Sequence, residues 1–289
     1  ATETRYYGVD GEPVLYRNEY AVIRQRFDEN RRLLWEAKFG TADEPLLYDA
    51  EDLYYQIACA YDEAGNLIDE RYLDADGQLT NRADGIARIV RTYDEAGRSV
   101  RVAYLDEQDQ PTLTADGYAS VAYEDYDEYG NATVTRYYGT DGEPAAYRDT
   151  YSVAVRRYNE QKKVLFAANY DVNGEPMLYA RNNTYYQIGY TYASNGKTVT
   201  EEHYYDGEGS PMNCKAGYAS FHRTYENGKI ARVDYFGPDG EPIALADGQA
   251  SVAYVRDENG NATETRYYGV DGEPVLYRNE YAVIRQRFD

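Results

Sequence analysis

Residues 1–28 and residues 262–289 of this chain have the same sequence, ATETRYYGVDGEPVLYRNEYAVIRQRFD. Between these two copies a proline that closes a glycine-containing turn recurs at a nearly constant distance, with Leu79 in place of one: Pro13, Pro45, Pro111, Pro144, Pro176, Pro211, Pro242 and Pro274. The intervals of 31 to 35 residues divide the chain into eight repeats and most of a ninth. A period of this length indicates an array in which each unit packs on its neighbours.

The 28-residue match predicts a higher-order period of 261 residues, because ordinary sister repeats such as 136–159 share turns and aromatic residues but differ elsewhere. We therefore interpret residues 1–289 as a single repeat array and as a fragment of a longer one. Its two ends should be superposable, and the last repeat should present an open edge. The expected partners are further copies of the same array.

One repeat, residues 117–144, reads as two strands and two turns. Its alternating first strand is rich in residues that suit a pleated surface, and Gly and Asn then supply a turn. A second strand leads to an Asp-Gly turn ahead of proline. The chain has no capped stretch of helical periodicity, so we predict an all-β fold of tandem hairpins. They form a β-solenoid or a spiralling antiparallel sheet, with a four-bladed propeller as an alternative. The spacing of Tyr118 and Tyr126, one residue longer than usual, suggests a local bulge.

The core of this array must be built largely from tyrosine, which occurs 36 times, because a lone hairpin is marginally stable in water. Three aromatic series follow the repeat and should line the interior or the seams between repeats as ladders. The first is Tyr6, Phe39, Tyr72, Tyr104, Tyr137, Tyr170, Tyr204, Tyr235 and Tyr267. The second is Phe27, Tyr61, Tyr93, Tyr126, Tyr158, Tyr192, Tyr225 and Phe288, broken by Arg256. The third is Tyr20, Tyr54, Tyr118, Tyr151, Tyr185, Tyr218 and Tyr281.

The net charge of -21 disfavours binding to nucleic acid and to anionic membranes, whose phosphates attract Lys and Arg. No apolar run approaches the ~20 residues that cross a bilayer, so no membrane insertion is expected. Cys59 and Cys214 occupy unrelated places in the repeat, which argues against a disulfide framework and against a cysteine metal site.

Residues 60–80 resemble the YD repeats of the bacterial Rhs proteins, on the matching positions Tyr61, Asp62, Gly65, Asn66, Tyr72, Asp76 and Gly77. The match recurs at Tyr93, Asp94 and Gly97 and at Tyr126, Asp127 and Gly130. The aromatic and glycine turns also look like choline-binding and toxin cell-binding hairpin repeats. The first resemblance implies a spiralling β-sheet shell. The second implies a β-solenoid that holds glycan or choline between neighbours. Both imply a secreted or surface-exposed bacterial protein.

Candidate chemistry is sparse. None of the familiar hydrolase, metalloprotease or nucleotide-binding motifs occurs, and a unique active site would need an exception to the repeat. We therefore expect no enzyme activity, no cofactor and no metal. Two features keep alternatives open. His203 and His222 lie on strands that could pair, and Asp74 and Asp76 precede a glycine as in some calcium loops. Ordinary strand positions and ordinary turn chemistry explain both.

Doubled tyrosines provide the one lead to a ligand. Neighbouring residues of a strand point to opposite faces, so one ring can serve the core while the other stacks on a sugar or an ammonium group. The candidate ligand-binding residues are Tyr7, Tyr55, Tyr138, Tyr186, Tyr205 and Tyr268. Two hypotheses follow: a structural stalk, shell or filament region of a large extracellular or cell-surface protein, or an adhesion module that binds cell-surface carbohydrate. In the structural hypothesis both rings of each pair serve packing.

Overall fold

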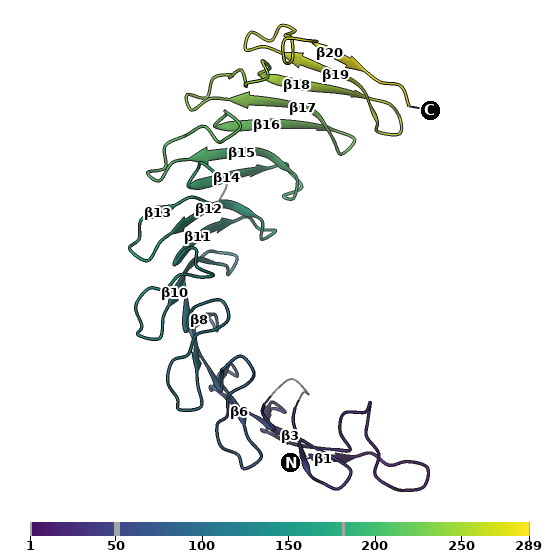
Figure 1. Ribbon diagram of the computed structural model, residues 1–289, viewed down its shortest axis with the longest axis vertical. Coiled ribbons are helices and arrows are strands. Elements are labelled where there is room, and N and C mark those ends of the chain that lie inside the picture. The colour runs from purple at the N-terminus through teal and green to yellow at the C-terminus, as the bar shows by residue number, and fades with distance from the viewer. Residues whose placement is uncertain (1, 49–52, 181–182, 289) are drawn as a thin grey trace. The chain divides into compact units, whose positions relative to one another are not determined.

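The computed structural model describes residues 2–48, 53–180 and 183–288 (Figure 1). These residues form antiparallel strands and no helix, which confirms the all-β prediction. The strands are β1 (Thr2–Arg5), β2 (Val22–Phe27), β3 (Leu33–Phe39), β4 (Pro45–Leu46), β5 (Gln56–Tyr61), β6 (Leu67–Leu73), β7 (Arg88–Tyr93), β8 (Ser99–Leu105), β9 (Ser120–Tyr126), β10 (Ala132–Tyr138), β11 (Val153–Tyr158), β12 (Val164–Tyr170), β13 (Pro176–Met177), β14 (Gln187–Tyr192), β15 (Val199–Tyr205), β16 (Ser220–Glu226), β17 (Lys229–Phe236), β18 (Ser251–Arg256), β19 (Ala262–Tyr268) and β20 (Val283–Arg285).

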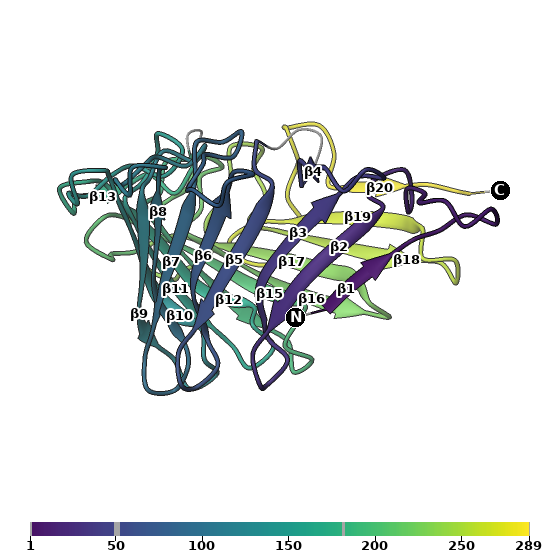
Figure 2. The ribbon, with the colours of Figure 1, turned by 90° about the horizontal axis from the view of Figure 1, so that it is seen from below.

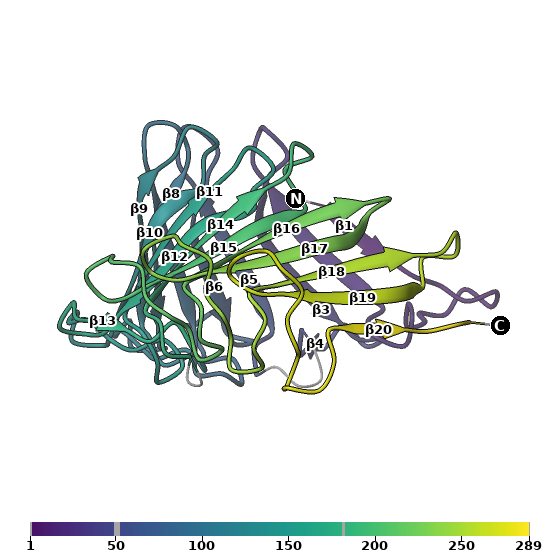
Figure 3. The ribbon, with the colours of Figure 1, turned by 90° about the horizontal axis from the view of Figure 1, so that it is seen from above.

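The chain divides into two compact units, Ala1–Glu124 with Thr135–Ser152 (unit 1) and Asp125–Val134 with Val153–Asp289 (unit 2). In both, successive strands pair in chain order. Figure 2 shows β1, β2, β3, β5 and β6 of unit 1 side by side, and Figure 3 shows the same order for β15 to β20 of unit 2. Among the described residues β1 pairs only with β2 and β20 only with β19, so the sheet is not closed.

The strand pattern has a shorter higher-order period than the 261 residues expected from the sequence. β2 begins at Val22 and β11 begins at Val153, 131 residues later. The two-residue strands β4 at Pro45 and β13 at Pro176 are also 131 residues apart. Strands β2 to β10 therefore correspond in order to β11 to β19. Four hairpins make one period, and the identical ends are two such periods apart.

Each hairpin closes through an Asp-initiated turn of the kind the sequence predicts. In the turn after β5, the Asp62 carboxylate accepts the Asn66 N–H at 2.8 Å, and the Asn66 carbonyl accepts the Asp62 N–H at 3.0 Å. Gly65 has φ +95°, a conformation that a side chain would disfavour. A bulge precedes the turn in every hairpin whose register is described, for example between Ala60 and Tyr61. The bulge is thus a general feature of the array and is not peculiar to residues 118–126.

Tyrosine rings pack into continuous clusters on one face of the sheet, which we call the tyrosine face. In unit 1, the Tyr54 and Tyr72 ring centroids lie 4.8 Å apart, and those of Tyr118 and Tyr137 lie 4.9 Å apart. In unit 2, Tyr185 and Tyr204 lie 4.5 Å apart. These contacts confirm the predicted ladders for the first and third series. Long-loop tyrosines outside those series stack on them: Tyr16, Tyr48, Tyr147, Tyr179 and Tyr277.

The assignment of Phe39 and Tyr170 to the first series is wrong. Both residues pair with the turn proline, Phe39 with Pro45 and Tyr170 with Pro176, as Tyr7 does with Pro13. They therefore correspond to the second ring of a tyrosine doublet, one residue further along the strand, and a one-residue shift reverses the face. The preceding residues take the first-series position. Lys38 lies there with its ammonium group 4.2 Å from the Tyr48 ring centroid.

Residues of the second series hold each hairpin to the one before it. The hydroxyl groups of Tyr93, Tyr192 and Tyr225 donate hydrogen bonds of 2.8 to 3.0 Å to the carbonyl oxygens of Leu67, Val164 and Val199, each the first residue of a strand in the preceding hairpin. Arg256, the exception to the tyrosine series, donates from its guanidinium to the Ile230 carbonyl at 3.1 Å. The predicted location at the seams is confirmed for these residues. Phe27 and Phe288, which lack a hydroxyl group, are exposed.

The identical ends adopt the same local structure. Glu3 pairs with Arg24, and Glu264 pairs with Arg285 in the same register. Tyr6 stacks on Tyr16 at 4.6 Å, and the equivalent rings Tyr267 and Tyr277 stack at 4.4 Å. The expectation that the two ends superpose is confirmed at this local level.

Candidate functional site

The face opposite the tyrosine clusters, which we call the groove face, carries a row of residues that pair with the turn proline or its equivalent. The row consists of Tyr7, Phe39, Leu73, Leu105, Tyr138, Tyr170, Tyr205, Phe236 and Tyr268. Successive members belong to successive repeats. The space between two members is bounded by the intervening strand, so grooves recur along this face.

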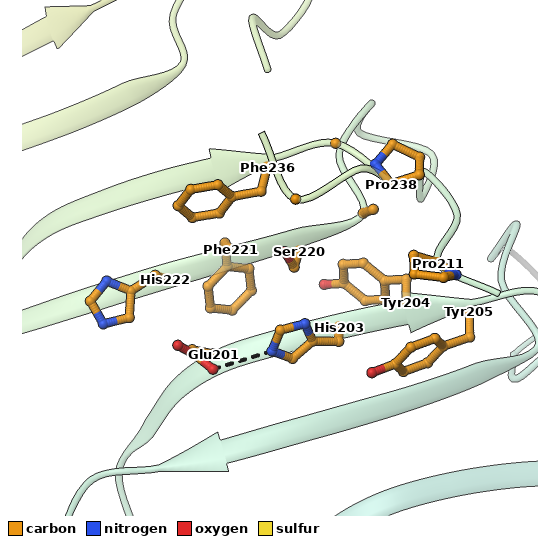
Figure 4. A pocket seen from close by; sticks show the side chains of 13 residues that line it. Glu201, His203, Tyr204, Tyr205, Pro211, Ser220, Phe221, His222, Phe236 and Pro238 are labelled. Carbon is orange, nitrogen blue, oxygen red and sulfur yellow. Dashed lines mark hydrogen bonds and ion pairs between the residues drawn. The ribbon is translucent and has the colours of Figure 1, made fainter. Parts of the chain in front are cut away.

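The largest of the grooves that we describe lies in unit 2 between Tyr205 and Phe236 and has a volume of about 420 Å³. β15 contributes Glu201, His203 and Tyr205 to its lining, and β16 contributes Ser220 and His222. Alternation along a strand places these side chains on one face. Figure 4 shows Phe236 on one side of the groove and His203 and Tyr205 on the other. Pro211, Pro238 and Gly240 close its end at the turns.

An acid and a histidine form the polar floor of this groove. The Nε2 atom of His203 lies 3.2 Å from Oε2 of Glu201 (Figure 4). Partial burial raises the pKa of the Glu201 carboxyl, but hydrogen bonds to His203 and Thr191 outweigh it, and the net effect lowers that pKa. Glu201 is therefore ionised at neutral pH. His222 lies directly opposite Glu201 in the β15–β16 register.

The groove does not contain a complete metal site. Within residues 2–48, 53–180 and 183–288, no group of three His, Cys, Asp or Glu side chains could hold a metal ion. The turn aspartates are engaged by the backbone: the Asp74 carboxylate accepts the N–H groups of Asp76 and Gln78, each at 2.9 Å. Cys59 and Cys214 are both free thiols.

The equivalent position in unit 1 is filled by an arginine of the chain itself. Nε and one terminal nitrogen of Arg88 donate to the Asp69 carboxylate, both at 2.9 Å. The other terminal nitrogen donates to Asp109 at 2.9 and 3.1 Å. Arg71 adds a third guanidinium contact to Asp69 at 2.7 Å. Burial raises the pKa of the Asp69 carboxyl, but these hydrogen bonds outweigh it and lower the pKa.

Two substitutions distinguish the unit 2 groove from its unit 1 counterpart. Register places Ser220 at the position of Arg88, since Arg71 pairs with Arg88 and His203 pairs with Ser220. Gly240 takes the position of Asp109, four residues beyond the row residue in both turns, and both have positive φ. The guanidinium and the acid that it bridges to are thus both absent from the unit 2 groove. The carboxylate under that guanidinium is retained as Glu201.

The six tyrosines predicted to bind ligand occupy two different positions. Tyr7, Tyr138, Tyr205 and Tyr268 belong to the groove-face row, where Tyr7 is 57% exposed. Arg101 covers the Tyr138 ring and Arg232 covers the Tyr268 ring, each at 5.2 Å from the centroid. Tyr55 and Tyr186 lie instead just before β5 and β14, and their N–H groups bond to the carbonyl oxygens of Leu73 and Tyr205. The six rings therefore do not form a single row.

Sequence reasoning missed Phe236, Ser220 and Gly240 as groove residues. Its alignment used one hairpin as the unit, and at that level Ser and Gly are ordinary strand and turn residues. Comparison of copies four hairpins apart would have shown Ser220 against Arg88 and Gly240 against Asp109. The loss of both partners of an ion pair is the signal that marks this groove.

No family profile matches this chain, and no curated protein is similar to it. Solved structures with similar segments include a crystal structure of TcdB2-TccC3-Cdc42 (18% identity, TM-score 0.31, 87% of this chain and 13% of that chain). A pore structure of the Photorhabdus luminescens Tc holotoxin with a TccC3 mutation has 15% identity and a TM-score of 0.28 over 86% of this chain and 13% of that chain. TcdB2-TccC3-TEV has 14% identity and a TM-score of 0.24 over 91% of this chain and 15% of that chain. This chain thus spans only a small part of the chains that it matches.

In the described part of the chain, no helix has the length and apolar character that a membrane span requires.

Proposed function

We propose that this chain is a non-enzymatic structural repeat region of a large secreted or cell-surface bacterial protein, serving as a stalk, shell or filament scaffold. The observation that carries the proposal is the repeated bond across the seam between hairpins. Tyr93, Tyr192, Tyr225 and Arg256 each reach a backbone carbonyl of the preceding hairpin. Because each hairpin bonds to its neighbours through backbone groups, sequence can drift elsewhere while the array keeps its form.

The tyrosine clusters support the same proposal. Tyr118 contacts Tyr104 of the preceding repeat at 5.9 Å and Tyr137 of its own hairpin at 4.9 Å. Tyr218 makes the equivalent contacts with Tyr204 and Tyr235 at 5.8 and 4.9 Å. An apolar core that runs from repeat to repeat is what an extendable scaffold needs.

An in-frame deletion of residues 22–152 tests this function. The deletion joins Ala21 to Val153 and removes one period of four hairpins while preserving the order of strands, since β2 and β11 are equivalent. In the full-length parent protein, a scaffold region should tolerate this change. The shortened protein should reach the same location, remain resistant to proteolysis, and show a shorter outline by negative-stain electron microscopy. Loss of a specific activity with an unchanged outline would instead indicate a functional module.

The carbohydrate-binding hypothesis required aligned, exposed second rings. Of the six candidates only Tyr7 has an exposed ring, and arginines cover Tyr138 and Tyr268. We therefore treat glycan binding as a competing outcome of the groove experiment described below.

A further inference from the structure

The groove face of unit 1 shows how this array binds a guanidinium group. Arg88 projects from β7 and its five-donor head bridges Asp69 and Asp109. Asp69 is buried, and its carboxylate receives two parallel N–H donors from Arg88. A planar fork matched to a carboxylate in this way is the strongest geometry available to a protein ion pair.

Unit 2 keeps the receptor half of this arrangement and lacks the arginine. Glu201 takes the place of Asp69 on the equivalent strand position, with Ser220 in place of Arg88. Replacement of Arg88 by serine and of Asp109 by glycine removes two long side chains from one location. The groove of about 420 Å³ lies there, lined by Ser220, Gly240 and Glu201.

The row residues at the two sides of this groove also change in a way that suits a flat cation. Leu73 and Leu105 in unit 1 are replaced by Tyr205 and Phe236 in unit 2. Elsewhere on this face the aromatic row residues receive a guanidinium: Arg24 lies 4.2 Å from the Phe39 ring centroid, and Arg232 lies 5.2 Å from that of Tyr268. Aromatic faces attract guanidinium groups through their quadrupole. Within the described residues no arginine covers Tyr205 or Phe236.

We propose that the groove formed by Glu201, Tyr205, Ser220 and Phe236 binds an arginine side chain of a partner polypeptide. The guest guanidinium pairs with the Glu201 carboxylate, lies between the Tyr205 and Phe236 rings, and donates to the Ser220 hydroxyl. The chain's net charge of -21 favours the approach of a basic segment. The proposal goes beyond the scaffold function, because it gives one repeat of the array a specific partner.

The two histidines provide a direct assay, because the chain has no others and both line the groove. The intact chain, labelled at histidine, is titrated with N-acetyl-arginine-N′-methylamide at about pH 8, where an ordinary imidazole is neutral. We expect saturable shifts of the His203 and His222 ring resonances. The citrulline analogue, which has the same shape without the charge, should cause no shift. The same titration with N-acetylglucosamine and choline covers the glycan and quaternary ammonium alternatives.

Two variants separate binding from folding. Glu201→Gln should weaken arginine binding by tenfold or more, and Ser220→Arg with Gly240→Asp restores the unit 1 residues and should abolish it by filling the groove. Thermal unfolding of each variant, together with an unchanged resonance pattern outside β15–β17, shows that the fold is kept. Arginine binding that survives Ser220→Arg with Gly240→Asp overturns the proposal. So does an absence of shifts with the arginine probe in the parent chain, or a stronger response to the saccharide.

Discussion

The hydroxyl group of Tyr225 in β16 donates a 2.8 Å hydrogen bond to the carbonyl oxygen of Val199, the first residue of β15. This bond crosses the seam between two hairpins and occupies a carbonyl beside a bulge. Tyr225→Phe removes the bond and leaves the ring in place. We expect the free energy of unfolding to fall by about 1 kcal/mol, the usual net value of such a bond. Urea denaturation monitored by circular dichroism measures the change.

Tyr7→Phe is the matched control, because the Tyr7 ring is exposed and makes no contact of this kind in the described structure. Its unfolding midpoint should stay at that of the parent. If Tyr225→Phe and Tyr7→Phe behaved alike, the seam bond would contribute nothing.

Arg256 performs the task of a tyrosine at the next seam. It donates from Nε and a terminal nitrogen to the Ile230 carbonyl, at 3.3 and 3.1 Å. We expect Arg256→Tyr to preserve stability, because tyrosine makes this bond in other repeats, and Arg256→Ala to lower it by roughly 1–3 kcal/mol through an unpaired carbonyl. Differential scanning fluorimetry of the two variants provides the comparison. Equal melting temperatures for Arg256→Ala and the parent would show that the contact is dispensable.

A left-handed turn position separates favourable from unfavourable repeats. Gly65 has φ +95° in its turn, whereas the equivalent Lys162 has φ +58° and the equivalent Arg31 has φ +63°. A side chain in this region costs roughly 1–2 kcal/mol. Lys162→Gly should therefore raise the free energy of unfolding by about 1 kcal/mol, and Gly65→Ala should lower it by a similar amount. Chemical denaturation of both variants tests the sign, and a stabilising Gly65→Ala change would refute this interpretation.

The tyrosine face makes stability sensitive to alkali. Burial, together with nearby ionisable groups, raises the pKa of Tyr185 and of Tyr218 from 10.0 to about 12. The folded state favours the neutral phenol, so this stabilisation is complete below pH 10 and is lost as the pH rises toward 12. We expect the urea midpoint to fall across that interval. Ultraviolet absorbance should show one group of tyrosines that ionise near the ordinary pKa and another that ionise only later or on unfolding. Titration of all tyrosines together in the folded protein would contradict the packing of these clusters.

Much of the fold follows from local chemistry that a sequence displays openly. Asp62 and Gly65 specify a turn by themselves, and the alternation before and after that turn specifies a hairpin. The tyrosine ladders also follow, since Tyr54, Tyr118 and Tyr185 recur at the same place in the repeat. The hydrogen bonds of Tyr93 and Tyr225 across the seam are consistent with the predicted location of the second series.

The remaining features depend on register, which a period of 31 to 35 residues does not fix. Phe39 lies next to glycine as Tyr7 does, but the shorter spacing to its proline concealed the fact that it faces the groove. The groove itself escaped notice because it is defined by what Ser220 and Gly240 lack. Their significance appears only beside Arg88 and Asp109, in a copy four hairpins away.

The central claim is that each hairpin draws its stability from its neighbours and that the array can therefore be extended. Residue 289 corresponds to residue 28, so residues 29–152 can be appended after Asp289 to add a further period of hairpins. Urea unfolding of the parent and the extended chain at equal concentration tests the claim most directly. Coupled repeats predict a higher midpoint and a steeper transition for the extended chain, with the same circular dichroism per residue. An unchanged midpoint, or a separate transition for the appended segment, would contradict the account.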